Sequence, residues 1–320
     1  MRILELILVA VVALASHAEA GEWKSLDGTT PETTPSPRSS GSPAVFGIKN
    51  SADPQRAIGG NVTDPDTALA MMAEKYKNAV GIVVRVGESR QKKMGTAWAV
   101  RPSWFATNSH ISDPVKVMLD KGIDVFIAVN KSQKRYRVVE AISHPRYGET
   151  KRNFEGKLSF ALSYDVGLLK IEGSTSKLFP LATINELRKL ASGSRIAYLG
   201  FPSENMEGGN VDIHRPLATM QSGIITTISD YWLGDSGFEK NLLLRHNLGA
   251  AGGASGSPIF NTRGKVVGIL NAGNLIYKYI RNKQGKILFD KNGDPRFERA
   301  PSAVMVNFAQ RIDLLNNILP

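Results

Sequence analysis

The stretch GGASGSPIF at residues 252–260 places a serine in a glycine-rich turn between two apolar runs. A nucleophilic hydroxyl needs a tightly turned, exposed backbone and nearby free N–H groups to bind an oxyanion, and glycines favour both. Ser255 is therefore a candidate nucleophile. An α/β-hydrolase would carry G-x-S-x-G, but Ser257 stands where the second glycine should be, and no HGGG-type element is present. A plain glycine–serine turn is the alternative interpretation.

A serine nucleophile needs a base, and few histidines are available. Beyond residue 20 the chain has His110, His144, His214 and His246. His110 ends the stretch WFATNSH at residues 104–110, where an apolar strand meets small polar residues. We expect His144, which precedes a proline, and His214, which lies in a polar segment, to be solvated. His110 is therefore the candidate base, and an exposed or structural histidine is the alternative.

The base in turn needs a buried carboxylate that fixes its tautomer and stabilises the imidazolium. The stretch YDVGLLKI at residues 164–171 places Asp165 directly before an apolar strand, a position that carboxylates avoid unless they are paired. An ordinary aspartate at the start of a strand is the alternative. The three candidates follow in the order His, Asp, Ser, with gaps of 55 and 90 residues. This order differs from those of subtilisin and the α/β-hydrolases.

The pattern of apolar residues favours an all-β fold. A helix is expected to start near Asp64 and to cover residues 67–77, and the apolar positions 308, 312, 315 and 318 predict a closing amphipathic helix. Between them, many short apolar runs are separated by turn residues, which indicates a sandwich or a pair of barrels. These runs are 80–86, 96–100, 125–129, 135–142, 166–171, 195–199, 223–228, 242–244 and 265–270.

The first 62 residues differ from the rest. Arg2, the apolar run of 13 residues from Ile3 to Ala15 and the triplet AEA at 18–20 predict a signal peptide over residues 1–20, with an uncleaved anchor as the alternative. A membrane-spanning helix needs about 20 apolar residues. Residues 21–62 are rich in Pro, Ser, Thr and Gly and predict a disordered linker or pro-segment. We therefore expect export, and no stable membrane insertion after cleavage.

Composition narrows the function further. The 320 residues contain no cysteine, so neither disulfides nor a lipoprotein anchor is expected, and an exported protein of this kind fits a bacterial envelope or medium. The formal net charge of +11 favours anionic partners in general, such as weak contact with anionic envelope surfaces. Lys and Arg are nevertheless spread along the chain, and we predict no nucleic-acid partner. Asp290, Asn292 and Asp294 resemble a calcium loop, but Gly293 is misplaced for one. We expect a hairpin turn there, no metal and no cofactor.

Several motifs together resemble the trypsin-like serine peptidases over about residues 68–318. TNSH at 107–110 resembles T-N-A-H of bacterial HtrA-type members, and DVGLLK at 165–170 resembles D-[IV]-A-L-L-K. GASGSP at 253–258 resembles G-N-S-G-[GS]-P, in the form found in the glutamyl-endopeptidase branch. SHPRY at 143–147 and the strand ending in GFP at 200–202 also resemble family motifs.

The resemblance implies a chymotrypsin-like fold of two six-stranded antiparallel β-barrels, at about 79–180 and 190–306, with a closing helix at 307–318. The peptidase domain would span residues 63–320. His110 and Asp165 would come from the first barrel and Ser255 from the second, and the backbone N–H groups of Gly253 and Ser255 would form the oxyanion hole.

The resemblance also implies a substrate pocket. Its base would be Gly249, where trypsins carry an acid, and Leu270 stands where glutamyl endopeptidases carry a histidine, so neither basic nor glutamyl side chains are expected to be preferred. Asn271, Ala272 and Gly273 would form the pocket wall and select small or medium apolar side chains. Ala254 replaces the aspartate that trypsins use in zymogen activation, so the activation-like segment Arg56–Gly60 is interpreted as linker. No PDZ domain is expected.

The sequence therefore predicts a secreted or periplasmic serine endopeptidase that acts on proteins and peptides through an acyl-enzyme. The alternative is a catalytically inactive protease fold that binds peptides or envelope components. Ser109 beside the histidine and Ala254 beside the serine are departures in its favour. An esterase that uses the same triad is a third hypothesis.

Overall fold

The computed structural model describes residues 64–87, 91–149, 151–154, 158–161, 163–202, 213–272, 275–282, 284–290, 296–301 and 306–320. The predicted signal peptide and linker, residues 1–62, lie outside this part of the chain, and so does the turn expected at Asn292 and Gly293. Within the described ranges no helix combines the length and the hydrophobicity needed to cross a membrane.

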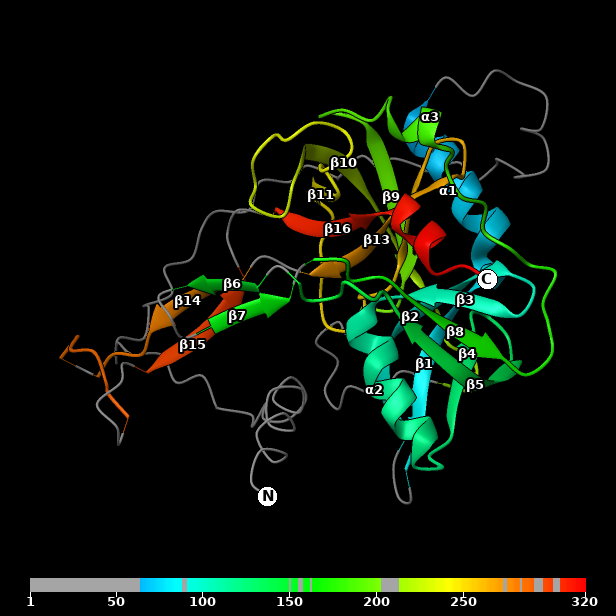
Figure 1. Cartoon of the computed structure of the whole chain (residues 1–320), viewed down its shortest axis with the longest axis horizontal. Helices are drawn as coiled ribbons and strands as arrows, with labels where there is room; N and C mark the ends of the chain where they lie inside the picture. The colour runs from blue at the N-terminus through cyan, green and yellow to red at the C-terminus, as the bar shows by residue number, and fades with distance from the viewer. Residues whose placement is uncertain are drawn as a thin grey trace, which may run out of the picture. The chain divides into compact units, whose positions relative to one another are not determined.

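Most strands of the first barrel coincide with the apolar runs of the sequence. Helix α1 (Pro65–Tyr76) begins at Asp64, whose carboxylate accepts the N–H groups of Asp66 and Thr67. A short 3₁₀ turn, η3 (Lys77–Ala79), leads from α1 into the barrel. The strands close in the antiparallel order β1-β2-β3-β8-β5-β4 (Figure 1). They are β1 (Val80–Val86), β2 (Gln91–Arg101), β3 (Trp104–Thr107), β4 (Val125–Val129), β5 (Arg135–Ser143) and β8 (Gly167–Ile171), and helix α2 (Ser109–Asp120) joins β3 to β4.

The second barrel is also closed, in the antiparallel order β10-β11-β16-β13-β12-β9. Helix α3 (Ile184–Leu187), which begins in a capping box at Thr183, precedes it. The strands of the second barrel are β9 (Arg195–Gly200), β10 (Thr219–Ser229), β11 (Leu243–His246), β12 (Pro258–Asn261), β13 (Val266–Ala272) and β16 (Asn307–Arg311). Two separate hairpins pair β6 (Lys151–Phe154) with β7 (Leu158–Ala161) and β14 (Leu275–Tyr279) with β15 (Phe297–Pro301). The predicted fold of two six-stranded antiparallel barrels is confirmed.

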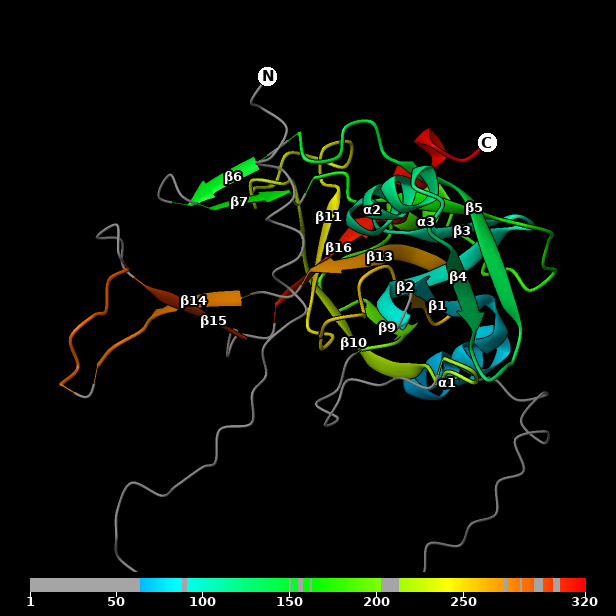
Figure 2. The ribbon, with the colours of Figure 1, turned by 90° about the horizontal axis from the view of Figure 1, so that it is seen from below.

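The end of the chain corrects one prediction. Residues 307–318 were expected to form a single helix, but the first five form strand β16, which pairs with both β11 and β13. Figures 1 and 2 show β16 beside β13. Only η4 (Ile312–Asn317) is helical, and it is a 3₁₀ helix. Residues 307–311 supply the sixth strand of the second barrel, and the spacing of apolar residues does not show this. The prediction therefore ended the barrel at residue 306, before this strand.

The segment between the barrels binds both of them. Phe179 donates its N–H to Ala99 O of β2 (2.9 Å), and Val266 of β13 donates to Pro180 O (2.8 Å). The ring of Phe179 packs on Phe260 of β12, with centroids 5.2 Å apart, and edge-on against Trp98 of β2, at 6.1 Å. These contacts form one apolar core that extends across the two barrels.

One core position of the second barrel carries a titratable side chain. His246 on β11 is fully buried, and within the described residues neither ring nitrogen makes a hydrogen bond of good geometry. Its cross-strand neighbours, Ile225 and Asn307, are uncharged. Burial lowers the pKa of His246 to about 4, although the backbone of Phe308 opposes the shift.

We expect this histidine to make the fold acid-sensitive. The pKa is about 6.5 in the unfolded chain and about 4 in the folded protein, so the unfolded chain binds the proton more tightly. The contribution of neutral His246 to the free energy of unfolding is present above pH 6.5. This free energy decreases by roughly 3 kcal/mol as the pH falls to 4. His246→Leu should flatten this dependence in urea unfolding measured at pH 7, 6, 5 and 4. An unchanged slope between pH 6.5 and 4 would contradict the assignment.

Candidate active site

His110 lies in the first turn of α2, directly after β3. Its sequence position suggested the end of a strand, but the chain turns into a helix at Asn108, the residue at the N-cap. The Asn108 side chain does not cap the helix; its amide donates to Asp165 O at 2.8 Å. The free N–H groups at the start of α2 therefore need another acceptor.

The carboxylate of Asp165 is that acceptor. Asp165 Oδ1 accepts the backbone N–H of His110 at 2.9 Å, and Oδ2 lies 2.7 Å from His110 Nδ1. The carboxylate is 2% exposed, so these bonds and the positive end of the helix dipole compensate the cost of burying its charge. One carboxylate thus caps the helix and fixes the orientation of the imidazole.

The same pair sets the protonation of His110. Burial lowers the pKa of His110, but the charge of Asp165 and the hydrogen bond to it outweigh burial, so the pKa is raised above its ordinary value. A proton on Nδ1 that points at Asp165 leaves Nε2 as the ring nitrogen able to accept a proton in the neutral form.

The loop that carries Ser255 is held against the first barrel. Thr96 of β2 donates its N–H to Ser255 O (2.8 Å) and its hydroxyl to Gly253 O (2.9 Å). A Cβ on Gly95 of β2 would collide with the side chain of Ile111 and would lie 3.0 Å from Ser255 O. Ser255 is therefore on the same side of β2 as Ile111, the neighbour of His110.

The Ser255 hydroxyl itself points towards β13. Its oxygen lies 3.5 Å from Asn271 O, and among the described residues no hydrogen bond joins it to His110. Hydrogen bonds of this type often become short only in the complex with substrate. The structure therefore pairs His110 with Asp165 and places the Ser255 loop against β2 beside Ile111, with the serine hydroxyl near Asn271 O.

Two N–H groups of the serine loop remain available. Ala254, Gly256 and Ser257 donate their N–H groups to Ala251 O, Leu270 O and Ala254 O at 2.8–3.0 Å. No acceptor within the described part of the chain receives the N–H groups of Gly253 and Ser255. Gly253 has φ +87°, a conformation that favours glycine. Two unpaired donors beside a serine are the arrangement that an oxyanion hole needs.

Comparison with known proteins places this geometry in a family. The trypsin-like peptidase domain matches residues 95–269, a span that contains His110, Asp165 and Ser255. The chain belongs to the trypsin-like peptidase family. Comparison with curated proteins finds no match.

Solved structures give a similar but distant picture. The HtrA-type protease AlgW with a decapeptide matches with a TM-score of 0.47 and 14% identity, over 77% of this chain and 64% of that one. The serine endoprotease from Yersinia pestis matches with a TM-score of 0.47 and 16% identity, over 78% and 64%. The match spans slightly less than two thirds of either of these chains.

The structure places four of the five residues that were predicted to form the substrate pocket. Leu270 and Asn271 lie on β13 beside the serine loop, and both are buried. Within the described residues, neither atom of the Asn271 side-chain amide has a hydrogen-bond partner. A Cβ on Gly249 would lie 2.7 Å from Gln221 Oε1, so Gln221 covers this glycine. Ala272 ends β13, and Gly273 lies outside the described residues.

Two other histidines, His144 and His214, were both expected to be solvated, and the structure differs at one of them. His214 is exposed, as expected, and its Nδ1 lies 2.9 Å from Arg135 Nη2. The expectation that His144 is solvated is wrong. His144 is 3% exposed, stacks on Tyr164 with centroids 5.0 Å apart, and lies with Nε2 3.2 Å from Asn317 Nδ2. Burial lowers the pKa of His144, and the charge of Arg146 adds to this effect. A stacking partner distant in sequence leaves no local signal.

Sequence reasoning also missed residues that support the site. Thr96 and Asn108 hold the serine loop and the Asp165 backbone, and Tyr231 donates to Gln310 while it accepts from Tyr164. The TNSH motif could have pointed to Asn108. Thr96 and Tyr231 act across 157 and 67 residues of sequence, respectively, so no pattern of neighbours reveals them.

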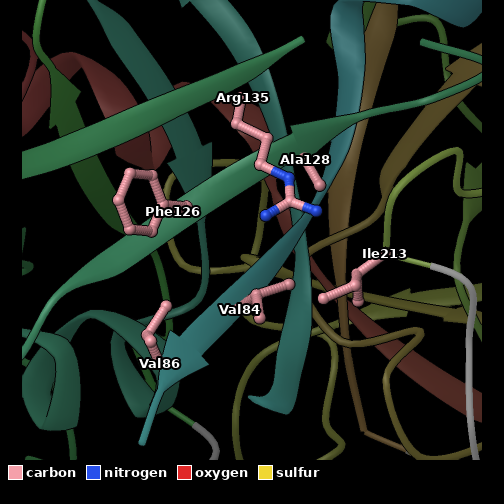
Figure 3. Close-up of a pocket in the computed structure, with 6 residues that line it drawn as sticks. All are labelled: Val84, Val86, Phe126, Ala128, Arg135 and Ile213. Atoms are coloured by element: carbon pink, nitrogen blue, oxygen red, sulfur yellow. The ribbon is translucent and has the colours of Figure 1, made fainter. Parts of the chain in front are cut away.

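A small hollow elsewhere on the first barrel is separate from these residues. It is lined by Val84, Val86, Phe126, Ala128, Arg135 and Ile213 (Figure 3). Strands β1, β4 and β5 form it together with Ile213, which lies between β9 and β10, and none of these elements carries a residue of the proposed triad. The described residues contain no cluster of three or more potential metal ligands.

The geometry predicts the titration of His110. The ring should titrate above its ordinary value of 6.5 because Asp165 outweighs burial. In Asp165→Asn the effect of burial is opposed only by the smaller effect of the Asp113 charge, and we expect the midpoint to fall below 6.5. An NMR pH titration of the imidazole resonances measures both values. Equal midpoints in the two proteins would contradict the pairing.

Gly253 provides a second prediction, with a matched control. Gly253→Ala places a Cβ at φ +87°, 2.7 Å from Phe201 O and against the Lys93 side chain. Gly237→Ala introduces the same left-handed strain at φ +82°, with nothing within 4 Å. We expect Gly237→Ala to cost about 1–2 kcal/mol and Gly253→Ala to cost about 1–3 kcal/mol more, from the collision. Urea unfolding measures both, and equal costs would contradict the close packing of the loop.

Proposed function

We propose that this protein is a serine endopeptidase that hydrolyses peptide bonds through an acyl-enzyme, with His110, Asp165 and Ser255 as its triad. The observation that carries the proposal is the Asp165 carboxylate, which binds both the backbone N–H and Nδ1 of His110. This arrangement directs Nε2 to act as the base. The unpaired N–H groups of Gly253 and Ser255 support the same conclusion.

The proposed reaction has two halves. A turn of the Ser255 hydroxyl away from Asn271 O brings it to Nε2 of His110, which takes the proton as Oγ attacks the scissile carbonyl. The N–H groups of Gly253 and Ser255 bind the oxyanion, and His110 then protonates the leaving amine. Water, deprotonated by His110, attacks the acyl group and releases the acid and free Ser255.

Asp165 keeps its charge throughout this cycle. Its two bonds hold the imidazole in the tautomer with hydrogen on Nδ1, and the carboxylate stabilises the imidazolium that forms in each half-reaction. The raised pKa of His110 places the lower limit of activity above the ordinary value for a histidine. Activity therefore rises as the pH increases through this pKa, because the neutral ring is the base.

The substrate side is proposed from the pocket residues. Gly249, Leu270, Asn271, Ala272 and Gly273 carry no charge, which disfavours basic and acidic side chains at the cleaved position. Gln221 narrows the space above Gly249. The proposed substrates are proteins and peptides with a small or medium apolar side chain at the cleaved position. The proposed reaction uses no cofactor or metal.

Location is proposed from the sequence. The apolar leader at residues 1–20 and the absence of cysteine favour a secreted or periplasmic protein of a bacterial envelope. The net charge of +11 favours weak contact with anionic envelope surfaces.

A second candidate function rests on one observation. The Ser255 hydroxyl is bonded to Asn271 O and not to His110, which is the geometry expected of a protease fold that binds peptides without cleaving them. The unpaired N–H groups of Gly253 and Ser255 favour the endopeptidase over this alternative.

A fluorophosphonate probe tests the proposal without a known substrate. It should label the wild-type protein at Ser255, and Ser255→Ala should abolish labelling and lower cleavage of an unfolded protein by a factor of about 10⁶. Gly237→Ala, away from the site, should be labelled like the wild type. Wild-type protein that is not labelled and does not cleave would contradict the proposal and favour the binding module. Labelled protein that hydrolyses only esters would indicate an esterase.

A further inference from the structure

We propose that Tyr231 is a positioning residue for the triad. Tyr231 belongs to the second barrel, and its hydroxyl fixes the turn of the first barrel that carries Asp165. The inference rests on the proposed function and goes beyond it, because it makes the geometry of the Asp–His pair depend on the contact between the barrels. Its hydroxyl bonds to Tyr164 and Gln310 and, among the described residues, to no member of the proposed triad.

The turn around Asp165 has an unusual backbone. Val166 donates its N–H to Tyr164 O at 2.8 Å, which encloses Asp165 in a three-residue turn. Tyr164 has φ +55°, a strained conformation for a residue with a bulky side chain. Such strain persists only where the surroundings impose it. The question is therefore which contacts hold Tyr164 in place.

The first barrel holds the far side of the turn. Asn108 Nδ2 donates to Asp165 O at 2.8 Å, and Ser109 Oγ donates to Val166 O at 2.7 Å. Both residues flank the turn from α2 and contact Asp165 or the residue after it. Neither contacts the backbone of Tyr164.

The second barrel supplies the missing contact. Tyr164 donates its N–H to the hydroxyl oxygen of Tyr231 at 3.0 Å, and Tyr231 donates its own proton to Gln310 Oε1 at 2.7 Å. A phenol has one proton to give, so the two bonds have a defined direction. Burial raises the pKa of Tyr231, which keeps that proton in place. All three side chains are buried.

Gln310 continues the connection towards the nucleophile. It lies on β16 opposite Ile269 of β13, and the next residues of β13 contact the serine loop. Gly256 donates its N–H to Leu270 O at 2.8 Å, and the Ser255 hydroxyl lies 3.5 Å from Asn271 O. The contacts from Tyr164 through Tyr231 and Gln310 therefore lead to β13, the strand that contacts the Ser255 loop.

The ring of Tyr164 is confined as well. His144 stacks on it with centroids 5.0 Å apart, the guanidinium of Arg146 lies 4.2 Å from its centroid, and the ring of Tyr231 is 5.2 Å away. A phenylalanine at position 231 would keep this packing and lose only the two hydrogen bonds. The hydroxyl therefore has a role that can be tested apart from packing.

Loss of the hydroxyl leaves a buried N–H and a buried amide oxygen with a broken bond, and Tyr164 is free to relax from its strained conformation. The carboxylate of Asp165 then moves relative to His110. The charge and hydrogen bond of Asp165 raise the pKa of His110 more than the charge of Asp113 does, so that pKa should fall. A displacement of a catalytic group by about 1 Å costs about 10²-fold in rate.

The experiment compares Tyr231→Phe with Tyr136→Phe. Tyr136 is a buried tyrosine of β5 that packs on Phe105, and no hydrogen bond of its hydroxyl is present among the described residues. Both changes remove one phenolic oxygen. Two quantities are measured against pH: the second-order rate of fluorophosphonate labelling, and the NMR titration of the His110 imidazole, which requires no activity.

We expect Tyr231→Phe to lower the labelling rate by about tenfold to 10²-fold and to move both the lower pH limit of labelling and the NMR midpoint of His110 to lower pH. Tyr136→Phe should change none of these. Gln310→Met, which removes the acceptor and keeps the hydroxyl, should move the midpoint in the same direction by less, and it replaces Tyr231→Phe if that variant does not fold.

The outcomes separate the two proposals. A His110 midpoint equal to that of the wild type in Tyr231→Phe, or in Gln310→Met where that variant replaces it, overturns the positioning role, whatever happens to thermal stability. A shifted midpoint in a protein whose wild type is never labelled supports the positioning role and overturns the endopeptidase. Equal shifts in Tyr136→Phe would show a general effect of losing a phenolic hydroxyl and would also overturn the proposal.

Discussion

The bond between the Asp165 carboxylate and His110 is the interaction around which the rest of the site is arranged. A carboxylate that is 2% exposed is costly to bury, and it persists only where donors satisfy it. The start of α2 supplies one N–H, and the imidazole supplies the other contact. The helix must therefore begin where β3 ends, and the turn before β8 must present Asp165 to it. Asn108 and Ser109 fix that turn by bonds to Asp165 O and Val166 O. The sequence from Thr107 to His110 thus serves folding and chemistry together.

Two small residues of β2 hold the serine loop close to the first barrel. Gly95 leaves room for Ser255 O, and a larger residue would collide with Ile111. The buried hydroxyl of Thr96 accepts the N–H of Phe201 at 3.1 Å and donates to Gly253 O at 2.9 Å. A change at any of these positions would alter the distance between base and nucleophile without touching either. We infer that the geometry of the proposed triad depends on the contacts between the barrels and not on either barrel alone.

The sequence predicted the parts of this structure that local patterns control. Strands such as 80–86 and 125–129 were located to the residue, because short apolar runs bounded by turn residues have few other uses. The serine loop was recognised because its glycines and its order relative to His110 and Asp165 are visible along the chain. The failures share a cause. Residues 307–311 were assigned to a helix because their pairing with β11 and β13 is not written in their own spacing. His144 was placed in solvent because its partners, Tyr164 and Asn317, are distant in sequence. Tyr231 went unnoticed for the same reason.

The two departures from the family pattern bear on whether the site is active, and the structure changes their weight. Ser109, in place of alanine, was an argument for an inactive fold. Its hydroxyl is buried, donates to Val166 O at 2.7 Å and accepts the N–H of His144 at 3.2 Å, so it adds an anchor beside Asp165 that alanine would lack. Ala254 is fully buried in the apolar core, where an aspartate would need a charged partner. An alanine removes that requirement, and within the described residues the N–H groups of Gly253 and Ser255 are unpaired. Both departures are therefore compatible with a site that needs no zymogen switch, and neither favours the inactive alternative any longer.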